Sequence, residues 1–131
     1  MDTIIQKDRE DMEIIAKSNN DYPVLMINQN RYLKGEFPNG DLYSKWRSIN
    51  KKMISEVKGK VIWSLKVEAP YLINGNLEPL DEILAFWYPS HKAFLSMINC
   101  PYRKDNFELR KKLIVYPVIH RCDGRNAPQI K

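Results

Sequence analysis

Residues 82–90, which read EILAFWYPS, carry the strongest fold signal in the chain. After the opening glutamate, the run is apolar at positions that face both sides of an extended strand, which is typical of a central strand. Pro89 ends this strand, and Ser90 is a suitable N-cap for a helix over residues 91–98. The sequence therefore predicts a buried strand that passes directly into a helix.

Other helices are predicted on both sides of this stretch. A helix from Leu42 to about Val57 is indicated by apolar residues at spacings of three and four, and Asp41 is its expected N-cap. Gly59 is expected to end that helix in the left-handed conformation. Pro101 suits the first turn of another helix, which would extend to about Lys112. An amphipathic pattern over residues 4–18 predicts a short N-terminal helix.

Three further strands complete a β-α-β-β-α-β order. They are predicted at residues 24–32, 60–68 and 113–122. This order is the ferredoxin-like pattern, an α+β fold with a four-stranded antiparallel sheet and helices on one face. The expected organisation is an N-terminal helical extension at residues 1–21, one domain at residues 22–122 and a flexible tail at residues 123–131.

The face of the sheet away from the helices is also expected to be apolar. Trp63, Leu65 and Val67 alternate along the second strand, and Ile62, next to Trp63, points to the other side, so neither face of this strand is fully polar. Exposed apolar sheet surface is usually covered by a partner. A second copy of the chain is the simplest cover, so the sequence predicts a homodimer packed sheet to sheet.

Composition and charge exclude several classes of protein. The 131 residues are 44% hydrophobic and 28% charged, which argues against disorder. Apolar runs fall far short of the ~20 residues that span a bilayer, and no signal-peptide pattern opens the chain, so we expect a cytoplasmic protein with no membrane contact. Much of the net charge of +5 comes from the basic residues of Lys45–Lys66. We interpret this stretch as a solvated helix face and not as a nucleic-acid site.

Two cysteines and two histidines leave little basis for a metal site. Cys100 and Cys122 form no CxxC pair, and His91 and His120 are far from each other in the sequence. The expected state is two reduced thiols, with no metal and no cofactor.

Aromatic residues on the predicted elements could line a pocket between the sheet and the helices. Their rings would stack on a flat apolar ligand, and their polar tips would orient it. The alternative is that they belong to the hydrophobic core or, for Trp63, to the dimer interface. These pocket candidates are Tyr32, Tyr43, Trp46, Trp63 and Trp87.

Candidate catalytic groups come from two strands and one helix start. Asn28 and Asn30 are two residues apart, so both point the same way, either to hold a carbonyl or enolate oxygen or to meet water at the open end of the strand. His120 is the candidate general base if it points inward. His91, at a helix N-terminus, is either a neutral imidazole lining the pocket or an exposed surface residue. Glu82 is a candidate acid or base, or a solvated strand end.

Four segments in chain order resemble the bacterial DUF1330 family, a domain of unknown function. The longest is Asp81–Met97, which contains Tyr-Pro-Ser followed by Ala-Phe-Leu. The other three are Pro23–Asn28, Gly40–Tyr43 and Gly59–Trp63. The family often has Trp where this chain has Leu80. The resemblance spans residues 22–122 and implies a dimeric α/β barrel, a superfamily whose enzymes use a pocket between the sheet and the helices.

Two functions follow from these expectations, beside the alternative of a structural dimer with no pocket. The first is a homodimer whose pocket holds an apolar or aromatic, polyketide-like metabolite. If it is an enzyme, it would be a cofactor-independent isomerase, cyclase or oxygenase of secondary metabolism. His120, Asn28 and Tyr43 would then carry proton transfer and oxyanion stabilisation. The second is a non-catalytic module that binds or senses a small molecule in the same pocket.

Overall fold

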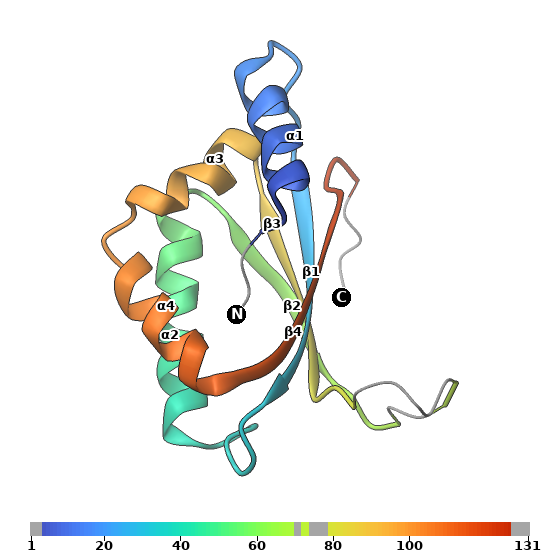
Figure 1. The fold of residues 1–131 in the computed structure, drawn as a ribbon, viewed down its shortest axis with the longest axis vertical. Helices are drawn as coiled ribbons and strands as arrows, with labels where there is room; N and C mark the ends of the chain where they lie inside the picture. Colours follow the sequence, from blue (N-terminus) through green and yellow to red (C-terminus); the bar gives the residue numbers. More distant parts are fainter. Residues whose placement is uncertain (1–3, 70–71, 74–78, 127–131) are drawn as a thin grey trace.

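A computed structural model of the chain describes residues 4–69, 72–73 and 79–126. Its elements follow one another in the predicted β-α-β-β-α-β order after an added N-terminal helix (Figure 1). They are α1 (Gln6–Lys17), β1 (Val24–Tyr32), α2 (Asp41–Glu56), β2 (Lys60–Lys66), β3 (Glu82–Tyr88), α3 (His91–Leu95), the 3-10 turn η1 (Ser96–Asn99), α4 (Arg103–Leu113) and β4 (Ile114–Asp123).

The strands form one antiparallel sheet in the order β2-β3-β1-β4. The two most apolar strands, β1 and β3, lie at its centre, as their sequences predict. Helices α2, α3 and α4 cover one face, while α1 packs against α3 at one end of the sheet (Figure 1). The predicted α+β class, the four-stranded antiparallel sheet and the extra N-terminal helix are therefore confirmed.

Strand register decides which side chains meet the helices. In β1 and β3 the even-numbered residues, such as Val24 and Leu84, face the helix layer and are fully buried. Because Met26 of β1 pairs with Arg121 of β4, the odd-numbered residues of β4 from 117 onward face the helices too. Their neighbours, including His120, point to the opposite, open face of the sheet. The helix-side core contains Trp46, Ile54, Leu84, Leu113 and Met12.

Several predicted details are corrected. Asp41 is the first residue of α2, and Gly40 is its N-cap without a side-chain bond. The left-handed residue after this helix is Lys58, with φ 67°, and not Gly59. Gly59 is needed for space instead, because a Cβ there would lie 2.9 Å from the Trp87 carbonyl oxygen. A β-bulge interrupts β2, so Val61 packs on the core while Trp63 pairs with Ala85 on the open face.

Three further observations concern the charged stretch, the character of the helices and the C-terminal tail. Lys45, Lys51 and Lys52 are exposed on α2, which confirms a solvated helix face there. In the described part of the chain, none of the helices combines the length and the apolar character that a bilayer crossing requires. The predicted tail lies largely outside the described residues, which end at 126.

Candidate functional site

A buried carboxylate lies at the start of β3. The sequence was also compatible with a solvated strand end at this position. Glu82 is 3% exposed, and its carboxylate accepts hydrogen bonds from the hydroxyls of Tyr32 at 2.6 Å and Tyr43 at 2.8 Å. Arg47 of α2 donates to the same carboxylate at 3.1 Å and to the Tyr43 hydroxyl at 2.7 Å. A buried charge needs such partners, so this cluster joins α2 to the sheet.

The two tyrosines of this cluster are hydrogen-bond donors and not bases. Burial, and then the hydrogen bond and charge of Glu82, raise the pKa of Tyr43 to about 12. The same causes raise the pKa of Tyr32 further above its ordinary value. Both hydroxyls therefore stay protonated at neutral pH. Tyr43, a predicted catalytic residue, is placed to hold Glu82 in the interior.

Asn28 and Asn30 of β1 point toward the helix layer and are buried, so neither meets water at an open strand end. Asn30 is 1% exposed and donates to the Tyr32 hydroxyl at 3.3 Å, while its Oδ1 has no partner among the described residues. Asn28 is 3% exposed and donates to the Met26 carbonyl at 3.3 Å. Trp46 is fully buried in the core, with its indole Nε1 likewise unpartnered within the described part of the chain.

The predicted catalytic set does not assemble. His120 pairs with Ile27 across the β1–β4 ladder, is exposed on the open face and lies 3.1 Å from Gln29. Asn28 and Tyr43 lie on the helix side of the sheet, so they cannot share a substrate with this imidazole inside one chain. Trp63 and Trp87 also belong to the open face, and Trp87 donates to the Gly124 carbonyl at 2.9 Å. They do not line a pocket beneath the helices.

His91 lies in the interior, contrary to the surface alternative for this residue. It is 1% exposed, and its Nδ1 lies 3.0 Å from the Asp21 carboxylate. The backbone N–H groups of His91 and Lys92 donate to the same carboxylate, so Asp21 fixes the start of α3 together with the Ser90 cap, which accepts from Ala93 N. Partial burial raises the pKa of Asp21, but these hydrogen bonds outweigh it and hold the pKa below its ordinary value.

Arg121 of β4 connects this histidine to a pocket. Its Nη1 lies 3.5 Å from His91 Nε2, and its Nη2 lies 3.8 Å from the Asp8 carboxylate of α1. With Nδ1 directed at Asp21, Nε2 is the acceptor nitrogen, which suits a neutral imidazole facing a guanidinium. Asp21, His91 and Arg121 thus form a chain of contacts from the start of α3 to β4.

The pocket beside Arg121 lies between α1 and β4 on the helix side of the sheet and has a volume of about 510 Å³. Most of its lining residues are apolar, and Asp8 and Arg121 are the charged residues of its lining. Pro117 and Ile119 form part of the β4 wall, which faces the helix layer by its register with β1. The remaining lining residues are Ile4, Ile5, Met12, Met26, Phe94, Val115 and Tyr116.

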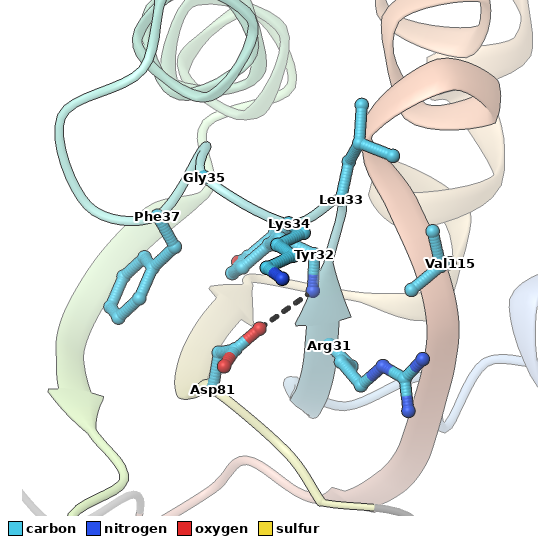
Figure 2. Close-up of a pocket in the computed structure, with 8 residues that line it drawn as sticks. All are labelled: Arg31, Tyr32, Leu33, Lys34, Gly35, Phe37, Asp81 and Val115. Atoms are coloured by element: carbon cyan, nitrogen blue, oxygen red, sulfur yellow. Dashed lines mark hydrogen bonds between the residues drawn. The ribbon is translucent and has the colours of Figure 1, made fainter.

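A second pocket, of about 530 Å³, lies at the end of β1 (Figure 2). Arg31, Lys34 and Asp81 give it a more polar rim, and the Asp81 carboxylate accepts from the Tyr32 backbone N–H at 2.8 Å. Of the predicted pocket residues, its lining includes Tyr32. The charged groups lie on a loop and a strand end, so this hollow offers less apolar enclosure than the α1–β4 pocket.

Three residues of these clusters were missed in the sequence. Arg121 and Asp21 were not among the candidates, and Arg47 was interpreted as part of a solvated helix face. The available signal for Arg121 was alternation, because it lies on the face opposite His120 along β4. Asp21 precedes a strand by three residues and gives no local sign of its partner 70 residues away.

Comparison with known proteins identifies the fold and leaves the family open. No family model and no curated protein matches the chain. The crystal structure of RPA0582, a protein of unknown function from Rhodopseudomonas palustris, is similar at 21% identity and a TM-score of 0.73, over 92% of this chain and 94% of that one. A nipsnap family protein with unknown function from Agrobacterium tumefaciens is similar at 16% identity and a TM-score of 0.55, over 83% and 95%. The DUF1330 resemblance stays a prediction.

Proposed function

We propose that this protein binds an apolar small molecule in the pocket between α1 and β4. The observation that carries the proposal is a half-open cavity of about 510 Å³ with mostly apolar lining residues and one pair of charged groups. Ligand pockets of about 300–1,000 Å³ usually combine such walls with a few polar groups that orient the ligand. This pocket lies on the helix side of the sheet, at Met26 and Ile119 rather than at the earlier candidates Tyr43 and Trp63.

The proposal includes a homodimer with the ferredoxin-like, dimeric α/β-barrel arrangement in the cytoplasm. Its support is the open face of the sheet, where Leu65 is 45% exposed and lies beside Ile83 and Trp63. Val118 and Ile27 continue the apolar character across β4 and β1. A second copy presents the same surface and can cover it by two-fold symmetry.

Binding of N-phenyl-1-naphthylamine, a neutral apolar dye that fluoresces in dry pockets, tests the ligand site. Ile119→Trp places an indole in the pocket and should weaken dye binding about tenfold, which corresponds to ~1.4 kcal/mol. Ile14→Trp, at a side chain that is 68% exposed on α1 and outside the pocket lining, is the matched control and should bind like the wild type. Equal binding by both variants would place the dye elsewhere and refute the proposed site.

A catalytic version of this function needs a different base from the one predicted. His91 is the remaining histidine, and its Nε2 lies 3.5 Å from Arg121, a residue of the pocket lining. If the protein is a cofactor-independent isomerase, cyclase or oxygenase, His91→Gln should abolish turnover while His120→Gln leaves it intact. Turnover that depends on His120 would contradict the assignment.

A further inference from the structure

We infer that the ligand of the α1–β4 pocket is an apolar molecule with a single carboxylate group, which Arg121 binds. The inference rests on the proposed function, because it names the ligand class of that same pocket. It commits to the charge of the ligand and to the residue that recognises it. Three features of the described residues carry the argument: the setting of Arg121, the weakness of its contact with Asp8 and the apolar walls.

Arg121 is held in place but is not neutralised from within the interior. Its side chain is 28% exposed and lines the pocket. The interior partner at Nη1 is the imidazole of His91, which carries no charge when Nδ1 donates to Asp21 and Nε2 accepts. The imidazole therefore orients the guanidinium without cancelling its charge. A guanidinium carries five N–H donors in a planar fork that matches a carboxylate with two parallel hydrogen bonds.

Asp8 is a weak competitor for the same guanidinium. The two groups are 3.8 Å apart, and the Asp8 side chain is 57% exposed near the start of α1. Exposed ion pairs of this kind contribute little to stability. A ligand carboxylate in the pocket can therefore replace Asp8 at Arg121, and removing Asp8 should strengthen anion binding.

The remaining lining favours one negative charge on a hydrophobic body. Among the described residues of this lining, the Tyr116 hydroxyl is the one neutral side-chain donor. Met26, Phe94 and Ile119 offer no donor to a second anionic group, and Asp8 would repel one. A dianionic phosphate head would leave charge facing apolar surface, which is costly. The pocket is therefore matched to a monocarboxylic acid with an aliphatic or aromatic body.

Calorimetric titration with decanoate and decan-1-ol, which share a ten-carbon chain, tests this assignment. The wild type should bind decanoate about tenfold more tightly than the alcohol. Arg121→Gln should remove that preference and leave decan-1-ol binding unchanged, and Arg121→Lys should keep part of it. Asp8→Asn should bind decanoate more tightly than the wild type does. Arg125→Gln, at an exposed arginine paired with Asp123 at 2.7 Å, is the matched control and should behave like the wild type.

The outcomes separate this inference from the proposed function. If decan-1-ol and the neutral dye bind, and decanoate shows no preference or keeps it in Arg121→Gln, the carboxylate assignment is wrong and the apolar site stands. If neither the dye nor the alcohol binds the wild type, the proposed function itself fails. A tighter complex with decyl phosphate than with decanoate would also overturn the assignment.

Discussion

Replacing Glu82 by glutamine should destabilise the fold strongly without changing the size of the side chain. The carboxylate accepts from Tyr32, Tyr43 and Arg47 and is 3% exposed. Glutamine keeps one acceptor oxygen and replaces the other with an NH₂ donor. The two tyrosine hydroxyls and the Arg47 guanidinium must then share a single acceptor. Removing one partner of a buried pair costs about 3–5 kcal/mol. Arg47 is 32% exposed and can recover part of its hydration, which lowers the expected loss to about 2–3 kcal/mol.

Thermal unfolding followed by circular dichroism at pH 7 measures this effect. For a chain of this length, a loss of about 2–3 kcal/mol lowers Tm by roughly 8–12 °C. Glu108→Gln, at an exposed position on α4, is the control and should change Tm by no more than about 2 °C. Both variants are compared at one protein concentration, since dimerisation would shift Tm by mass action. A decrease of less than about 3 °C for Glu82→Gln would refute the view that this cluster joins α2 to the sheet.

Two further predictions concern acid stability and assembly. Because the folded-state pKa of Asp21 lies below its ordinary value, this carboxylate stabilises the protein above pH ~4 and loses that contribution as the pH falls through the lowered pKa. In the Asp21→Asn variant, the free energy of unfolding should therefore fall less steeply between pH 5 and pH 2 than in the wild type. An unchanged dependence on pH would contradict this role of Asp21. Leu65→Asp should give monomers in sedimentation velocity, whereas Ile98→Asp, at a similarly exposed residue of η1, should stay dimeric; a monomeric wild type would refute the dimer.

The fold was largely accessible from the sequence because its central strands have strong local signals. The predicted bounds of β1 and β3 coincide with those in the structure, since Pro23 and Pro89 flank apolar runs. The bulge in β2 was not accessible, because it depends on how Val61 and Trp63 pair with β3. Alternation along β2 alone gave the wrong face for Trp63 relative to Val61.

The candidate site was only partly accessible. Asn30, Tyr32 and Tyr43 were candidates whose sheet face the sequence left open. Glu82, which binds both tyrosines beneath the helices, is 50 residues from Tyr32 and gave no local signal of burial. His120 was a candidate base only if it pointed inward, and the sequence could not decide this because β4 carries apolar and polar residues at both alternations. The pocket depends on where α1, which packs on α3, lies relative to β4, and this tertiary arrangement has no periodic pattern in the sequence.

A crystal structure of the protein grown with decanoate tests the central claim most directly. The account predicts the alkyl chain between α1 and β4 against Met26 and Ile119, with both carboxylate oxygens about 3 Å from the Arg121 guanidinium. The Asp8 carboxylate should then have moved away from Arg121. An empty α1–β4 pocket in a crystal that holds decanoate elsewhere, or a decanoate whose carboxylate points away from Arg121, would contradict the account.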